Sequence, residues 1–221
     1  MDRKVIATVK ALETIGITEL YVKKERERLH TETKQYLLQE LFKRLQEEKR
    51  CVLYEGSSGY VFGDGDPNSY VVFVGEAPGE EEDKQKKPFV GKAGKYLNSK
   101  IEEIGLRRGD VYITNVVKSR PPGNRKPTKE EMASCAPYLI KEVEIIRPKL
   151  IVCLGATALE GLLGKSLSIT KHRGRLFEYP YDRSIKVLLT YHPAYVLRNP
   201  AANREFTEDM RKIKEFLSQH P

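Results

Sequence analysis

Two hydrophobic patterns divide the chain. From Met1 to about Arg50 the sequence is highly charged, and its later apolar positions follow a helical spacing. This apolar stripe consists of Tyr36, Leu37, Leu38, Leu41, Phe42 and Leu45. From residue 70 onward, short apolar runs alternate with amphipathic stretches. The first pattern predicts helices that pack by one face, and the second predicts strands that alternate with helices.

The four apolar runs are YVVFVG from residue 70, VYITNVV from 111, LIVCLG from 150 and KVLLTYHP from 186. Helical patterns lie near residues 92–104, 128–146, 156–163 and 203–217. Thr128 and Glu131 have capping-box spacing, and Pro148 ends that helix. This alternation predicts an α/β fold, with a central, mainly parallel four-stranded sheet and helices on both faces.

A Gly-rich connection at residues 56–69 separates the two patterns, and no internal repeat interrupts the second one. We therefore predict an N-terminal helical extension at residues 1–47 and one α/β domain at residues 48–221. The charged face of the extension is either solvated or in contact with DNA phosphates.

Composition narrows the class of protein. The chain has 221 residues, 39% hydrophobic, which suits one or at most two domains. It contains no apolar run of 18 residues and no signal-peptide pattern, so we expect a cytoplasmic protein without membrane contact. The net charge of +8 favours an anionic partner such as nucleic acid, although a basic protein with a solvated surface has the same balance.

Polar groups follow the predicted strands. GEAPG at 75–79 follows the first run, Asn115 ends the second and precedes KSRPPGNR at 118–125, and His192 ends the fourth. Taken singly, each is typical of a turn, a cap or a structural histidine. Parallel sheets bind ligands outside the carboxyl ends of their strands, so we expect these groups to converge.

A carboxylate, a carboxamide, a histidine and an aromatic ring such as Phe89 suit recognition of a nucleic-acid base. The carboxamide pairs with the base edge, the ring stacks, and the histidine stabilises negative charge on the departing base. Glycosidic cleavage also needs a carboxylate that offsets positive charge on the sugar and positions water. The segment from Tyr195 to Arg198 could fill the gap left by a flipped nucleotide.

At these residues the sequence resembles the uracil-DNA glycosylase superfamily, and within it family 4, the thermostable iron-sulfur type. The motifs that carry the resemblance are GEAPGEEED at 75–83, PFVGKAG at 88–94, NVVKSRPPGNR at 115–125, CLGATAL at 153–159 and HPAYVLRNP at 192–200. The resemblance covers roughly residues 48–218 and leaves the N-terminal helical segment unexplained.

The resemblance implies a role for each motif residue. Phe89 would stack on uracil, Asn115 would read its polar edge, and His192 would donate to its O2 oxygen. Glu76 would orient the hydrolytic water, which the backbone at Ala77 helps to hold. The remaining substrate-binding candidates are Gly75 and Glu82, of which Glu82 either shares the carboxylate role or crowds the thymine methyl group.

The candidate DNA contacts fall in two groups. Basic side chains that could meet phosphates are Lys118, Arg120, Arg125, Arg173 and Arg198. Tyr195 and Leu197 are the candidate wedge.

The chain departs from the family at the positions of its four-iron four-sulfur cluster, which fall at Glu48, Cys51, Ser119 and Cys135. Only two of these are Cys, so we expect the cluster to be absent or incomplete and catalysis not to require it. Cys51 and Cys135 either form a disulfide or remain as two free thiols. The third thiol, Cys153, lies in an apolar run, and we interpret it as a small buried hydrophobic residue.

The resemblance implies a monofunctional glycosylase that flips uracil out of DNA and hydrolyses its N-glycosidic bond to leave an abasic site. The expected partner is uracil-containing DNA and the expected state is a monomer, while protein partners are unknown from the sequence. Two alternatives stay open: a DNA-binding relative that has lost turnover, and a glycosylase for another deaminated base, such as hypoxanthine or xanthine.

Overall fold

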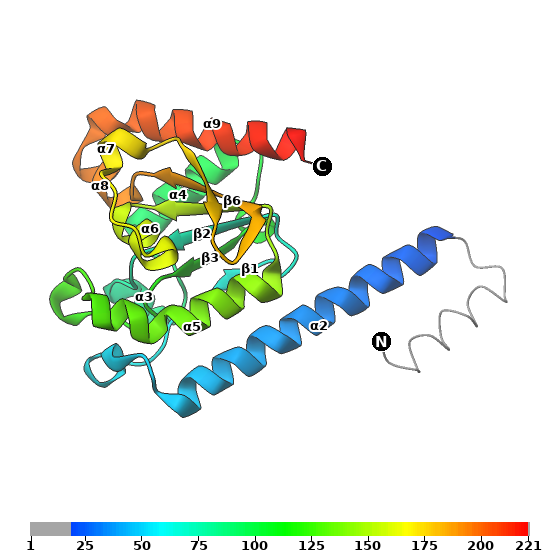
Figure 1. Cartoon of the computed structure of the whole chain (residues 1–221), viewed down its shortest axis with the longest axis horizontal. Helices are drawn as coiled ribbons and strands as arrows, with labels where there is room; N and C mark the ends of the chain where they lie inside the picture. The colour runs from blue at the N-terminus through cyan, green and yellow to red at the C-terminus, as the bar shows by residue number, and fades with distance from the viewer. Residues whose placement is uncertain (1–18, 221) are drawn as a thin grey trace.

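The structure is a computed structural model, and it describes residues 19–220 of the chain. The helical pattern predicted before residue 19 lies outside the described residues. The described part is built around one six-stranded sheet with the strand order β1-β3-β2-β4-β6-β5 (Figure 1).

The four central strands are parallel: β2 (Val71–Gly75), β3 (Tyr112–Asn115), β4 (Leu150–Leu154) and β6 (Asp182–Thr190). They match the four apolar runs, so the predicted parallel core is confirmed. Two antiparallel edge strands complete the sheet, β1 (Asp64–Gly65) beside β3 and β5 (Leu176–Tyr179) beside β6. The sequence pattern missed both, because one has two residues and the other is mostly exposed.

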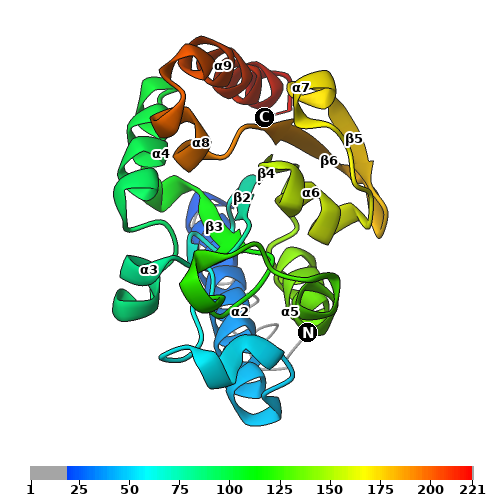
Figure 2. The same ribbon diagram turned by 90° about the vertical axis from the view of Figure 1, so that its left-hand side faces the viewer.

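Helices cover both faces of the sheet, as predicted (Figure 2). Val71 and Phe73 of β2 belong to the core beneath α4 (Lys92–Glu103) and α9 (Asn203–Gln219). Val72 and Val74 point to the opposite core, beneath α5 (Lys129–Ile146) and α6 (Ala156–Leu163). All four strand residues are buried, which explains why the run is apolar without alternation.

Local signals set the ends of α5. The Thr128 hydroxyl accepts a hydrogen bond from the Glu131 amide (3.2 Å), and the Glu131 carboxylate accepts one from the Thr128 amide (2.7 Å). The helix ends at Ile146, where Arg147 adopts a left-handed conformation before Pro148. The shorter elements are the helices α3 (Glu80–Gln85), α7 (Ile169–His172) and α8 (Pro193–Arg198) and the 3-10 turns η1 (Val52–Gly56), η2 (Arg108–Asp110), η3 (Pro122–Asn124) and η4 (Pro200–Ala202).

The helix α2 (Glu19–Glu48) packs on the outside of α5 (Figure 1). Of its apolar stripe, Leu41 and Leu45 are buried in the core, whereas Tyr36 and Leu37 are 59% and 44% exposed. The predicted one-sided packing is thus confirmed for the end of α2 that leads into the domain. None of the helices in residues 19–220 is long and apolar enough to cross a membrane.

Candidate active site

A cavity of about 410 Å³ lies at the carboxyl ends of the central strands. Its walls come from the segments after β2, β3 and β6, where a doubly wound sheet places its ligands. The lining residues are Glu76, Ala77, Pro78, Gly79, Glu82, Phe89, Ala93, Asn115, Pro121, Asn124, Arg125, His192, Ala194 and Arg198. Glu76, Asn115 and His192, which the sequence places after three different strands, therefore do converge.

The floor of the cavity is built where β2 meets β3. Gly75 and Asn115 are paired in the parallel register. A Cβ on Gly75 would lie 2.4 Å from Asn115 Oδ1 and 2.6 Å from the Phe89 ring, so the site tolerates only glycine there. Asn115 is 2% exposed, and its Oδ1 has no hydrogen-bond partner among the described residues. A buried carbonyl in that state is prepared to accept a ligand's N–H.

The aromatic wall is held in an unusual backbone conformation. Phe89 has φ +54°, which is rare for a residue with a side chain. The carboxylate of Glu82 accepts hydrogen bonds from the amides of Val90 (3.0 Å) and Gly91 (2.8 Å), and from Gly79 (3.2 Å) on the other side. Glu82 thus joins the two motif loops. Its carboxylate is engaged with backbone amides, which supports neither of the two roles expected from the sequence.

His192 is the N-cap of α8, and its ring centroid lies 5.7 Å from that of Phe89. Its Nδ1 accepts a hydrogen bond from the Ala194 amide (3.1 Å). Because a backbone amide can only donate, Nδ1 carries no proton and the neutral ring carries it on Nε2. Burial, assisted by the Arg198 guanidinium, lowers the pKa of His192 to about 4. The ring is therefore a neutral N–H donor at physiological pH.

The acidic wall follows β2 directly. Glu76 is half-buried at the cavity, and its backbone carbonyl accepts a hydrogen bond from the Val117 amide (3.2 Å). Ala77 lines the cavity beside it. The segment after β2 is in this way fixed to the segment after β3, which holds the Glu76 backbone beside Asn115.

Three predicted cations lie at or near the mouth of the cavity. Arg125 and Arg198 line it, and Arg120 donates a hydrogen bond to the side chain of Asn124 (2.7 Å), which also lines it. Arg125 makes a bidentate ion pair with Glu131, the residue that caps α5. These positions are compatible with phosphate contacts around the opening.

Two other predicted DNA contacts are corrected by the structure. Lys118 is fully buried, and its ammonium is paired with Glu142. Arg173 is largely buried, and it donates to Asp209 (3.2 Å) and to the Glu205 carbonyl (2.6 Å) of α9. Each of these cations is engaged inside the protein by a residue distant in sequence, so neither is available to a phosphate.

The candidate wedge lies on α8, directly after His192. Tyr195 and Leu197 are 38% and 45% exposed. The Tyr195 ring also packs in a tilted arrangement against Tyr191, with centroids 5.0 Å apart, and its hydroxyl accepts a hydrogen bond from Asn199 (2.9 Å). Leu197 is therefore the more exposed of the two apolar side chains beside the cavity.

Sequence reasoning missed part of the lining. Asn124 has φ +56° at the end of η3, and it faces the cavity with Pro121. The loop KSRPPGNR was noticed for its charge, although its asparagine and proline also form cavity wall. The Ala194 amide, which sets the His192 tautomer, has no side-chain signal and could not be found from the sequence.

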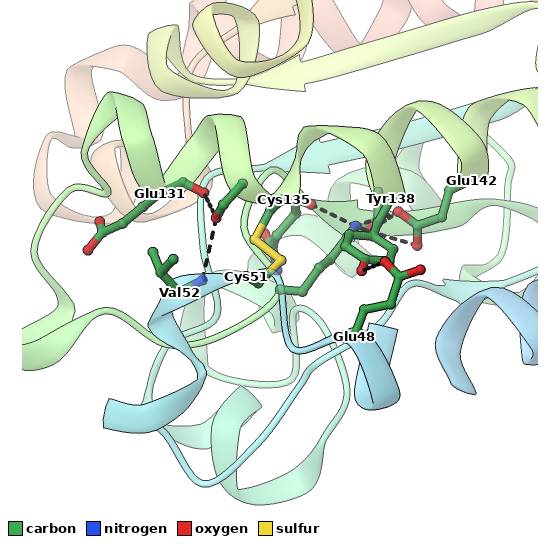
Figure 3. The surroundings of a disulfide bond; sticks show 11 residues. Glu48, Cys51, Val52, Glu131, Cys135, Tyr138 and Glu142 are labelled. Atoms are coloured by element: carbon green, nitrogen blue, oxygen red, sulfur yellow. Dashed lines mark hydrogen bonds and ion pairs between the residues drawn. A yellow bond between two sulfur atoms is a disulfide. The ribbon is translucent and has the colours of Figure 1, made fainter. Parts of the chain in front are cut away.

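Three positions of the family's iron-sulfur cluster, Glu48, Cys51 and Cys135, lie together on the α5 side, in a region separate from the cavity lining (Figure 3). Cys51 and Cys135 form a disulfide, with Cα atoms 5.0 Å apart, so the hypothesis of two free thiols is wrong. Glu48 accepts a hydrogen bond from the Tyr138 hydroxyl (2.7 Å), and Ser119 is fully buried. Cys153 is a free, buried cysteine, as expected.

This donor set does not fit a four-iron cluster. Such a cluster is held by thiolates, and here one carboxylate, one hydroxyl and one disulfide occupy the corresponding positions. Within the described residues, no group of three or more His, Cys, Asp or Glu side chains is arranged to hold a metal ion.

Comparison with known proteins agrees with this geometry. The family model for the uracil DNA glycosylase superfamily matches residues 62–216. A type-4 uracil-DNA glycosylase of Thermotoga maritima is 45% identical over 190 residues, which cover 85% of this chain and 98% of the relative. A second, from Archaeoglobus fulgidus, is 42% identical over 82% of this chain and 94% of its own length. A third, from Sulfurisphaera tokodaii, is 47% identical over 76% and 79%. The chain belongs to the uracil DNA glycosylase superfamily and, within it, is similar to type-4 enzymes at 42–47% identity.

Proposed function

We propose that this protein is a uracil-DNA glycosylase that binds a flipped uracil in the cavity and hydrolyses its N-glycosidic bond. The observation that carries the proposal is the pair of prepared groups on that cavity: the unpartnered buried Oδ1 of Asn115 and the neutral ring of His192. A base with an imide N–H beside carbonyl oxygens satisfies both groups at once. The 42–47% identity to type-4 enzymes supports the same substrate.

In this proposal, binding precedes chemistry. The base stacks on the Phe89 ring, and Asn115 pairs with its polar edge. Leu197 and Tyr195 enter the gap that the base leaves in the helix, while Arg125 and Arg198 contact phosphates. The floor of the cavity at Gly75 holds the base in one orientation. This positioning contributes to catalysis because the base does not have to be oriented during the chemical step.

The chemical step breaks the bond between the sugar C1′ and the base N1. The bonding electrons move into the uracil ring, and the Nε2–H of His192 donates to the O2 oxygen, where negative charge develops. Glu76 offsets positive charge on the sugar and aligns a water, which adds to C1′ and transfers its proton to the carboxylate. The uracil leaves as an anion, and the proton held by Glu76 passes to it through solvent, so the products are neutral uracil and an abasic site and the carboxylate is regenerated.

This route uses only side chains and water. Among residues 19–220, no lysine lines the cavity, so we expect the proposed enzyme to leave the DNA strand uncut. We infer that it acts as a monomer on DNA inside the cell, with uracil-containing DNA as its partner.

The test is release of free uracil from a uracil-containing oligonucleotide by wild type, Glu76→Ala and His192→Ala. We expect release by wild type and its loss in both variants. Binding without release by wild type would overturn the proposal in favour of an inactive DNA-binding relative. Matched oligonucleotides with hypoxanthine or xanthine complete the test, since faster release of either base would contradict uracil as the substrate.

A further inference from the structure

A buried ion pair lies directly behind the base-reading asparagine. Lys118, in the loop after β3, and Glu142, on α5, are both 0% exposed. Burying two charges carries a large desolvation cost before their mutual attraction is counted, and an apolar pair often gives equal stability. Stability alone therefore explains this pair poorly.

The ammonium group reaches the strand end that carries Asn115. Besides Glu142, it donates to the Thr114 hydroxyl (2.7 Å) and to the backbone carbonyl of Asn115 (2.9 Å). That carbonyl belongs to the last residue of β3. The amide on the other side of the same peptide unit, from Val116, donates to the Gly75 carbonyl (2.9 Å). Both polar ends of the peptide unit after Asn115 are thus fixed, and with them the backbone from which the Asn115 side chain projects.

Glu142 holds the lysine in place and is itself satisfied. Its Oε1 accepts hydrogen bonds from the Tyr112 hydroxyl (3.0 Å) and the Gly63 amide (3.2 Å), and Thr114 bridges it to Lys118. Figure 3 shows Glu142 on α5, near Tyr138 and the disulfide. The Glu142 carboxylate therefore binds groups from β3, from the loop after β3 and from the chain before β1.

We propose that Lys118 is a positioning residue for base recognition: its ammonium holds the Asn115 carbonyl, and thereby aims the Asn115 carboxamide into the cavity. This inference rests on the proposed function. Lys118 touches neither base nor DNA and acts through Asn115. Its loss lowers kcat, because the carboxamide must meet the base in the transition state and a small displacement there costs about a hundredfold.

Two single variants distinguish the effect of losing the hydrogen bond to Asn115 from the effect of breaking the ion pair. Lys118→Met and Glu142→Gln both break the pair, but only Lys118→Met removes the donor to the Asn115 carbonyl. The double variant Lys118→Met with Glu142→Gln removes both charges, keeps an acceptor for Tyr112 and Gly63, and restores much of the stability lost in Lys118→Met.

Uracil release is measured at a temperature at which circular dichroism shows that all the variants are folded. We expect kcat to fall about a hundredfold in Lys118→Met and in the double variant, with KM within about threefold, and to fall less than about fivefold in Glu142→Gln. Equal losses in the two single variants, or recovery of kcat in the double variant, would show that Lys118 is structural only and would overturn the inference.

Amide hydrogen exchange at Val116 provides a readout independent of activity. We expect exchange about tenfold faster in Lys118→Met and in the double variant than in Glu142→Gln, because the strand end loses one of its two anchors. Unchanged exchange would overturn the inference. If wild type releases no uracil, the proposed function fails, and this exchange measurement alone decides whether Lys118 holds Asn115.

Discussion

The cavity at the strand ends and the disulfide region on the α5 side differ in how many of the residues expected from the family they contain. The cavity presents the expected carboxylate, carboxamide, ring and imidazole on its wall. The disulfide region has a carboxylate and a hydroxyl at two of the four positions where the family has cysteine, and the other two are oxidised to a cross-link. One short segment serves both, because Asn115 and Ser119 lie four residues apart.

The difference follows from what each region must supply. The cavity needs particular atoms at particular places, since hydrogen-bond donors and acceptors are read by the substrate. The cross-linked region has to join η1 to α5, and any bond between them restricts the unfolded chain. We therefore expect the chemistry of the cavity in this protein not to depend on its internal cross-link.

The largest effect is expected at the imidazole. His192→Ala removes the only donor that we assign to the departing base, and kcat for uracil release should fall by about a hundredfold to a thousandfold. Single-turnover assays measure the loss, and unchanged binding of uracil-containing DNA is the control. A loss below tenfold would mean that another group stabilises the leaving base.

The next prediction concerns the disulfide. Cys51→Ser with Cys135→Ser opens a link between residues 84 apart in sequence. The free energy of unfolding should fall by about 2–5 kcal/mol, because the unfolded chain regains entropy. Chemical denaturation measures this change. The rate of uracil release by the folded variant should stay within about threefold of wild type, and a hundredfold loss would contradict the separation of the two regions.

A smaller effect is expected at the cavity mouth. Arg198→Ala removes one proposed phosphate contact, so KM should rise about threefold to tenfold and the salt dependence of binding should weaken by about one counterion. Binding to labelled oligonucleotides at several salt concentrations measures both quantities. Arg183→Ala is the matched control, because Arg183 is exposed on β6, outside the cavity lining, and should change neither.

The smallest expected effect is that of pH. With its pKa lowered to about 4, His192 stays neutral well below the usual histidine range. Uracil release should be flat from about pH 8 to about pH 5, and should fall as the ring protonates below that. A histidine free of this burial would lose its neutral form near pH 6.5. A drop in kcat centred there would contradict the assigned environment.

The same shift has a consequence for stability. Because the folded-state pKa of His192 lies below its unfolded value, the unfolded chain binds the extra proton between about pH 6.5 and about pH 4. His192 therefore favours unfolding progressively as pH falls through that window, and has no such effect above it.

Local pattern was enough to predict the four parallel strands, the capping box at Thr128 and the convergence of Glu76, Asn115 and His192. These follow from strand burial, from spacing along one helix, and from the rule that parallel strands end at one edge. The edge strand β1 could not be predicted in this way, because its two residues, Asp64 and Gly65, are too few to form a hydrophobic pattern.

Tertiary partners explain the remaining differences. Lys118 reads as a cation on a basic loop, and only the fold brings Glu142 from α5 to bury it. Arg173 is likewise taken by Asp209. The state of Cys51 and Cys135 stayed open for the same reason, since spacing in sequence does not give the 5.0 Å between their Cα atoms.

The central claim, that the cavity works without the family's cluster, is tested most directly by assaying uracil release from protein shown by metal analysis to contain no iron and by thiol titration to retain its disulfide. We expect multiple turnovers by this protein, with no gain when iron, sulfide and reductant are added. Activity that appears only after such reconstitution would show that the cavity needs the cluster.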